Sequence, residues 1–183
     1  MVMNNIEVER KISGIKNENE RKVARFLQKL ELEFVDCNLK VGEHEHQLLG
    51  EIDLLYKFQD HLFLVEVSKE KKANEKRFAF FTKWVDKDVL QWITKKYQLR
   101  SKKIMRVYFE VYAKKPQDFV SPLLKNMTKE GKMNKVVYSD RYDFFENALR
   151  NNPKEARGEF LKELGLLKQS LFKRSMKKYL NGS

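Results

Sequence analysis

The chain lacks the features that mark disulfide-bonded, exported and membrane-spanning proteins. It has a single cysteine, Cys37, which cannot form a disulfide within the chain. No apolar run reaches the ~18 residues of a transmembrane helix, so we expect no membrane partner. The N-terminus also lacks the basic and then apolar pattern of an export signal. These absences predict a cytoplasmic protein in which Cys37 is a small core residue.

Several catalytic motifs are missing as well. The sequence has no phosphate-binding glycine loop, no Gly-x-Ser-x-Gly elbow and no paired cysteines for zinc. Hydrophobic residues nevertheless make up 42% of the 183 residues, which excludes global disorder and allows a sizeable core. This length predicts one domain over residues 1–150 and a basic helical extension over residues 151–183.

Positive charge dominates the chain but is unevenly distributed. The formal net charge is +12 and the pI is close to 9.6. Residues 1–68 hold 9 basic and 13 acidic side chains, so the positive excess lies entirely in residues 69–183. An acidic region followed by a basic one fits metal-binding carboxylates beside a surface for a polyanion. The alternative is a solvated, lysine-rich surface without a specific partner.

The stretch from Gly50 to Lys69 contains two apolar, β-prone runs on either side of the polar pair Gln59-Asp60. This pattern predicts a β-hairpin. With a two-residue loop at that pair, the register places Asp53 opposite Glu66. Opposed like charges destabilise a sheet, so a divalent cation such as Mg²⁺ between the carboxylates would explain the pairing. The alternative is a strand with one wet face, on which the pairing has no role.

The sequences of these two predicted strands resemble those of a known protein family. Gly-Glu-Ile-Asp-Leu at residues 50–54 and Val-Glu-Val at residues 65–67 are similar to the core of the restriction-endonuclease-like nuclease superfamily, including archaeal junction resolvases. The family pattern is Asp, a variable gap, Asp or Glu, any residue, and Lys. The resemblance covers residues 17–113. It implies an α/β fold in the order helix, three strands, helix, strand (αβββαβ), with a mixed central sheet flanked by helices.

The resemblance also implies an activity and its site residues. It implies a metal-dependent nuclease that hydrolyses phosphodiester bonds in DNA, in repair, recombination or defence. Asp53 and Glu66 would hold one or two Mg²⁺ or Mn²⁺ ions, with the Val67 carbonyl as a further ligand. The first helix of the family often supplies another acid, and Glu20 is the candidate here. Glu20 has an alternative role, because Asn17 and Glu20 have the spacing of a capping box.

One position departs from the family pattern, because Ser68 stands where the family has lysine. Lys69 is the next residue, but a regular strand would point it to the opposite face, so it would need a β-bulge to join the site. Lys72 or Lys76 on the following helix would be other sources of the positive charge. The alternative is that Ser68 marks an inactive or weakened nuclease fold that still binds nucleic acid.

Further elements and contacts follow from periodicity and charge. We expect four basic residues at the start of the helix after the hairpin to contact phosphates: Lys71, Lys72, Lys76 and Arg77. Each basic residue that binds near a phosphate releases counterions, which favours binding. Apolar periodicity predicts helices over residues 17–31, 71–97, 140–150 (capped by Asp140) and 154–180, and strands over residues 33–41, 103–113 and 135–138. The last helix is basic, which suits an accessory nucleic-acid contact or a homodimer surface.

Overall fold

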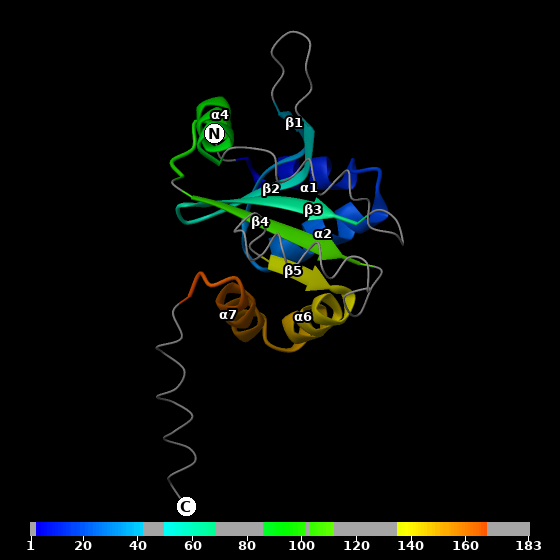
Figure 1. Ribbon diagram of the computed structural model, residues 1–183. Coiled ribbons are helices and arrows are strands. Elements are labelled where there is room, and N and C mark those ends of the chain that lie inside the picture. Colours follow the sequence, from blue (N-terminus) through cyan, green and yellow to red (C-terminus); the bar gives the residue numbers. More distant parts are fainter. Residues whose placement is uncertain (1–2, 42–49, 69–85, 102, 112–134, 168–183) are drawn as a thin grey trace, which may run out of the picture.

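The computed structural model describes residues 3–41, 50–68, 86–101, 103–111 and 135–167 (Figure 1). The described elements are, in chain order, α1 (Asn5–Ser13), α2 (Glu18–Lys29), β1 (Glu33–Val41), β2 (Gly50–Phe58), β3 (His61–Val67), α4 (Asp86–Tyr97), β4 (Lys103–Glu110), β5 (Lys135–Tyr138), α6 (Ser139–Asn151) and α7 (Pro153–Glu163). None of the helices in these ranges is long and apolar enough to cross a membrane.

The five described strands form one mixed sheet in the order β1-β2-β3-β4-β5. The first three strands are an antiparallel meander, whereas β4 pairs parallel to β3 and β5 pairs parallel to β4. Parallel neighbours need a crossover connection, and α4 lies in the segment that joins β3 to β4. The predicted α/β class with a mixed central sheet is therefore confirmed.

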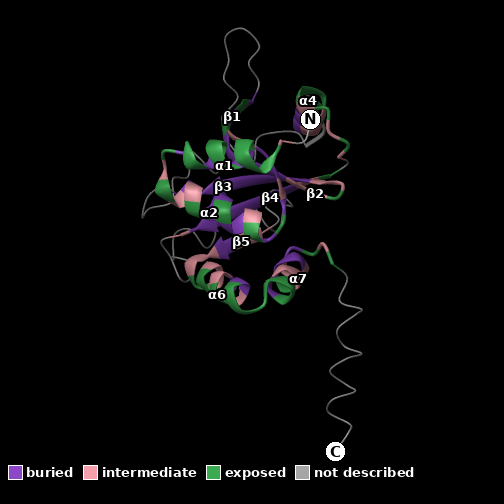
Figure 2. Ribbon diagram, turned by 180° about the vertical axis from the view of Figure 1, so that it is seen from behind, coloured by how far each residue is buried: buried purple, intermediate pink, exposed green. Residues whose placement is uncertain are grey.

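Helices cover both faces of this sheet and enclose two hydrophobic cores. The first core lies under α1, α2, α6 and α7, and Figure 2 shows α1 and α2 in front of the strands. Its members include Ile12, Val23, Phe26, Leu54, Tyr56, Phe63, Val65, Val67, Phe109, Phe145 and Phe160. The second core lies under α4 and contains Val35, Leu39, Val41, Ile52, Leu55, Leu62, Leu64, Val89, Ile93 and Tyr108.

Side-chain caps fix where the first two helices begin. In α1, Asn4 and Glu7 form a reciprocal capping box at the start of the helix. In α2, the Asn17 side chain accepts hydrogen bonds from the backbone N–H groups of Asn19 and Glu20. The predicted first helix and its cap at Asn17 are confirmed.

The predicted cap at Asp140 is wrong. β5 ends at Tyr138 and α6 begins at Ser139, so Asp140 lies inside the first turn and its carboxylate accepts from the N–H of Arg141. The sheet sets this boundary, because the chain passes directly from strand to helix. The carboxylate still lies where the helix dipole favours negative charge.

The helix predicted over residues 154–180 ends early, at Glu163, although the structure describes the chain as far as residue 167. α7 ends at Glu163, and Gly165 follows with a φ of 74°, a left-handed conformation that glycine adopts readily after a helix. Residues 168–183 lie outside the described residues. Within α7, Phe160 packs in the first core beside α2. The division into a domain over residues 1–150 and an extension over 151–183 stays a prediction.

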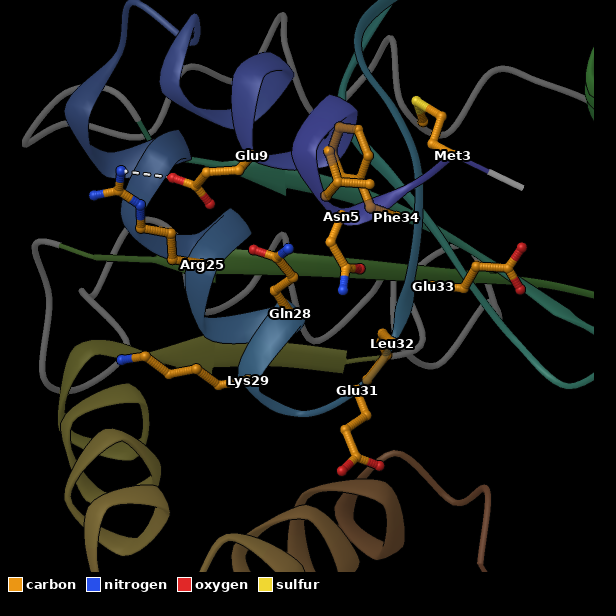
Figure 3. A pocket seen from close by; sticks show the side chains of 11 residues that line it. Met3, Asn5, Glu9, Arg25, Gln28, Lys29, Glu31, Leu32, Glu33 and Phe34 are labelled. Atoms are coloured by element: carbon orange, nitrogen blue, oxygen red, sulfur yellow. Dashed lines mark hydrogen bonds and ion pairs between the residues drawn. The ribbon is translucent and has the colours of Figure 1, made fainter. Parts of the chain in front are cut away.

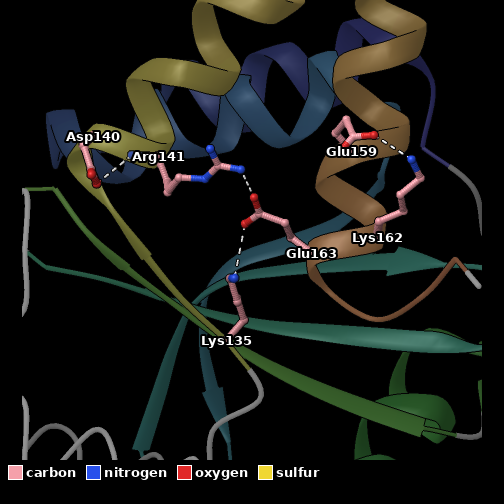
Figure 4. A network of polar contacts seen from close by, with 6 residues as sticks. All are labelled: Lys135, Asp140, Arg141, Glu159, Lys162 and Glu163. Atoms are coloured by element: carbon pink, nitrogen blue, oxygen red, sulfur yellow. Dashed lines mark hydrogen bonds and ion pairs between the residues drawn. The ribbon is translucent and has the colours of Figure 1, made fainter. Parts of the chain in front are cut away.

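Glu163 joins the end of α7 to two other elements (Figure 4). Its carboxylate lies 3.2 Å from the ammonium of Lys135 on β5 and contacts the guanidinium of Arg141 on α6. Half-buried groups in a shared network contribute more than isolated exposed pairs. This contact therefore holds α7 against the edge of the sheet.

Asp36 on β1 connects the two helix layers across the edge of the sheet. Its carboxylate contacts the Lys11 ammonium of α1 at 2.8 Å and accepts a hydrogen bond from the Tyr97 hydroxyl of α4 at 2.5 Å. The N–H of Cys37 donates to it as well, at 3.0 Å. Partial burial raises the pKa of Asp36, but the hydrogen bonds from Lys11, Tyr97 and Cys37 outweigh this effect, so the net pKa lies below its usual value.

This contact predicts an acid-sensitive contribution to stability. A carboxyl group whose pKa is lower in the folded state stabilises the protein above its unfolded-state pKa and loses that effect as the pH falls through the folded value. We expect Asp36→Asn to lower the free energy of unfolding by about 1–2 kcal/mol at pH 7, allowing for solvent screening. The difference from wild type should shrink below about pH 4 in urea titrations. A difference that stays constant down to pH 2 would contradict this account.

Candidate functional site

The hairpin between β2 and β3 has the register that the sequence predicts. Leu54 pairs with Val65, and the pairing continues without a shift to Phe58 and His61 beside the loop. Asp53 and Glu66 are the next residues on the two strands, directly after the last pair, Leu54 and Val65. Both side chains are buried, with exposed fractions of 0% and 4%. The structure therefore brings the two predicted carboxylates to the same end of neighbouring strands.

Asp53 is fixed by a hydrogen bond to the strand that carries Glu66. Its Oδ2 accepts from the backbone N–H of Val67 at 2.9 Å. The side chain therefore reaches across to β3 beside Glu66, and its orientation is set by a backbone donor that substitution cannot remove.

The strand alternation breaks at Asp53. Leu54 packs in the first core and Leu55 in the second, as a regular strand requires, yet Ile52 also packs in the second core. The flanking pairs of β1 and β2 place Asn38 opposite Asp53, and Asn38 has a φ of 49°. This left-handed residue therefore lies on β1 at the point where Asp53 leaves the regular pattern on β2.

Glu66 lies on the face of the sheet that α4 covers. Leu62 and Leu64 belong to the second core, and Glu66 continues their alternation along β3. Its partner on the parallel strand β4 is Tyr108, which belongs to the same core. Ser68 is the next residue on this face, is 4% exposed, and donates its backbone N–H to the carbonyl of Phe109 at 2.9 Å.

Three polar residues of β4 extend this face, and the sequence pattern did not single them out. Arg106, Tyr108 and Glu110 are buried, and the Tyr108 hydroxyl donates to Glu110 Oε2 at 3.3 Å. Alternation alone assigns them to the face opposite the apolar side chains, which usually means solvent. A strand between two parallel neighbours is covered on both faces, and that topology is the signal that would have identified them.

The charge balance of the buried residues is negative. Among the described residues, the buried charged side chains are four carboxylates and one guanidinium: Glu20, Asp53, Glu66, Glu110 and Arg106. Buried carboxylates require hydrogen bonds, a counter-charge or a metal ion. The effect of Glu110 extends to β5, because burial raises the pKa of Tyr138 and the Glu110 charge raises it further.

Glu20 is buried, as predicted, but it belongs to the helix layer on the first-core face. The Tyr56 hydroxyl donates to the carbonyl of Ala24 at 2.7 Å, which fixes α2 along β2. Burial raises the pKa of the Cys37 thiol to about 11, with smaller contributions from the charges of Asp36 and of Glu20, which lies one helical turn before Ala24. Cys37 pairs with Leu54, so the first turn of α2 lies over the Asp53 end of β2.

The other predicted positive groups cannot be placed. Lys69 and the predicted phosphate contacts Lys71, Lys72, Lys76 and Arg77 lie outside the described residues. Their roles in water positioning and phosphate binding stay predictions. Val67 is placed, and its N–H holds Asp53 as described above; whether its carbonyl is a metal ligand is a separate prediction.

The donor chemistry of Asp53 and Glu66 fits a hard divalent cation. Mg²⁺ is commonly held by one or two carboxylates, and water and phosphate oxygens complete its coordination. Each carboxylate oxygen has two lone pairs, so Asp53 retains acceptor capacity beside its bond to Val67. Across the part of the chain that is described, no group of three or more His, Cys, Asp or Glu side chains is arranged to hold a metal ion.

A large open pocket lies elsewhere, between α1, the C-terminal half of α2 and the start of β1 (Figure 3). It measures about 720 Å³. Its floor is apolar, with Val8, Leu32 and Phe34, and its rim carries charged groups that include the ion pair of Glu9 and Arg25. Glu33 at this pocket pairs with Lys57, so the pocket lies at the hairpin-loop end of β2, away from Asp53.

Comparisons with protein-family models, with curated proteins and with solved structures found no match for this chain.

Proposed function

We propose that the protein is a metal-dependent nuclease that hydrolyses phosphodiester bonds in DNA, in repair, recombination or defence. The observation that carries the proposal is the hairpin register. It brings Asp53 and Glu66, both buried, to the same end of two neighbouring strands. The hydrogen bond from Val67 to Asp53 supports a built site, because it orients one carboxylate beside the other.

The element order supports the same proposal. A helix, three antiparallel strands, a helix and a parallel strand follow one another as α2, β1, β2, β3, α4 and β4. This is the αβββαβ order that the resemblance to restriction-endonuclease-like nucleases implies. The order alone does not define an activity, so the argument for function rests on the two carboxylates.

In the proposed mechanism, Asp53 and Glu66 would hold Mg²⁺ or Mn²⁺, with the Val67 carbonyl as a further candidate ligand. Glu20 stays a candidate only on the Asp53 side, because α2 covers the face of the sheet opposite to Glu66. When bound, the ion would lower the pKa of a water molecule and offset the charge of the phosphate. The backbone N–H of Val67 keeps the Asp53 carboxylate oriented toward β3. Burial of both side chains strengthens their electrostatic effect on anything bound between them.

A second function is favoured by Ser68. This residue is buried on the face of Glu66, at the position where the resembled family has lysine, and a hydroxyl carries no positive charge. The protein would then be a nucleic-acid-binding module with weak or no cleavage, and Lys69 would have no catalytic role. The net charge of +12 supports a nucleic-acid partner in both cases.

The test is incubation of the purified protein with linear, branched and single-stranded DNA and with RNA, in Mn²⁺, Mg²⁺ or a chelator. We expect cleavage of a DNA substrate that requires the metal and stops in the chelator. Tight, salt-dependent DNA binding without cleavage would replace the nuclease by the binding module. Failure to bind any nucleic acid at low salt would overturn both.

A further inference from the structure

A basic groove runs between the exposed faces of α2 and α6. It measures about 550 Å³ and is lined by Lys22, Arg25, Lys29, Tyr142, Asp143, Glu146, Asn147 and Arg150. Its lining carries four positive and two negative side chains. The neighbouring pocket shares Arg25 and Lys29 but also contains Glu9, Glu31 and Glu33, so its lining is net negative. Of the two pockets beside α2, only the groove with α6 therefore has a net positive lining.

The cations on the α2 side form a row along one face of the helix. Lys22, Arg25 and Lys29 are spaced by three and four residues, which places them on neighbouring turns. The row extends about 10 Å along the helix axis, which matches about three phosphates of one DNA strand. Their side chains are 50–59% exposed, so a ligand can reach all three.

The existing ion pairs of these cations do not prevent binding of a polyanion. Lys22 pairs with Glu18 within its own helix, and Arg25 pairs with Glu9 of α1. Exposed pairs of this kind contribute little to stability, so a phosphate can take over the cation at small cost. Lys29 contacts Glu146, whose carboxylate also accepts a hydrogen bond from the Tyr142 hydroxyl. Glu146 is therefore compensated within the groove.

The groove begins at the end of the sheet that carries the proposed active site. The Tyr142 hydroxyl lies 3.5 Å from the carbonyl oxygen of Lys22, so the first turn of α6 lies beside the first half of α2. The first turn of α2 lies over the Asp53 end of β2, as shown above. We propose that the groove is a binding track for the phosphate backbone of DNA and that it leads from Lys22 near the site to Lys29. This inference deepens the proposed function and rests on it for the identity of the ligand.

The test compares two variants that remove the same charge from opposite helix layers. The groove variant is Lys22→Gln/Arg25→Gln/Lys29→Gln, and the control is Lys95→Gln/Lys96→Gln/Arg100→Gln on and just after α4, where all three side chains are exposed. Affinity for a fluorescent 20-base-pair duplex and for a 20-nucleotide single strand is measured in a chelator, from low to high salt.

We expect the groove variant to lose about 10- to 100-fold in affinity. The slope of log K against log salt should become less steep by about 2–3. The control should stay within about threefold of wild type. Equal losses in both variants would show a general charge effect and overturn the track, and so would a larger loss in the control. If a thermal melt shows that removal of Lys29 impairs folding, the double variant Lys22→Gln/Arg25→Gln replaces the triple variant. Its slope of log K against log salt should be less steep than that of wild type by about 2.

The two proposals fail in different ways. If the wild-type protein binds DNA without cleaving it and only the groove variant loses affinity, the track stands and the nuclease does not. If the wild-type protein cleaves DNA and the groove variant binds it like wild type, the nuclease stands and the track is wrong.

Discussion

Asp53→Ala and Glu66→Ala should each lower metal-dependent DNA cleavage by about 1000-fold or more. Each change removes one of the two buried carboxylates that are proposed to hold the cation, and the remaining one cannot hold it alone. DNA affinity measured in a chelator should stay the same or increase, because a negative charge close to the phosphates is lost. The measurement is single-turnover cleavage of a labelled duplex together with equilibrium binding.

Asp88→Asn is the matched control for these variants. Asp88 lies on α4, is exposed, and is not part of the proposed site. The Asp88→Asn protein should therefore cleave DNA at a rate within about twofold of wild type. Thermal melts of all three variants separate loss of the site from loss of the fold. Cleavage by a folded Glu66→Ala protein at the wild-type rate would rule out a role for Glu66 in metal binding.

Phe26→Ala should cause the largest loss of stability among single changes in the first core. Phe26 has no exposed surface, and its ring contacts Tyr142 of α6 at 5.0 Å, Phe160 of α7 at 5.4 Å and Phe109 of β4 at 6.0 Å, measured between ring centroids. Truncation would leave a cavity where four elements meet. We expect a loss of about 3–5 kcal/mol in the free energy of unfolding, which corresponds to a fall in Tm of about 10 °C.

Phe144→Ala is the control for this prediction, because Phe144 on α6 is 50% exposed. It contacts Arg141 with a cation–π geometry at 4.5 Å, and the loss of that contact should cost less than about 1 kcal/mol. Equal losses for Phe26→Ala and Phe144→Ala in urea titrations would show that the aromatic cluster does not hold the helices together.

The site end of the hairpin was predictable because two local signals agree. Two apolar, β-prone runs identify the strands, and the short polar pair Gln59-Asp60 between them identifies the loop. Together they define a register, and the structure has the same register from Phe58 and His61 to Leu54 and Val65, the neighbours of Asp53 and Glu66. Asn17 was identified as a cap for a similar reason, since its hydrogen bonds involve only the next three residues.

The features that were missed depend on contacts between distant segments. The break in alternation at Asp53 arises opposite Asn38, on another strand, and the spacing of residues within β2 carries no trace of it. Arg106 and Glu110 alternate with apolar residues as solvent-facing side chains do, but they lie on the face of Tyr108, which packs in the core under α4. The parallel pairing of β4 with β3 and β5 is the sign that this strand is covered on both faces. A sequence pattern defines the faces of a strand, whereas the topology decides which faces meet water.

The most direct test of the account is a crystal structure of the protein grown with Mn²⁺, with anomalous diffraction recorded to locate the metal. We predict a manganese peak about 2–2.5 Å from carboxylate oxygens of both Asp53 and Glu66, with the Val67 N–H still bonded to Asp53. Manganese bound at other residues, or Asp53 and Glu66 directed to separate surfaces, would contradict the proposed metal site and the nuclease activity that depends on it.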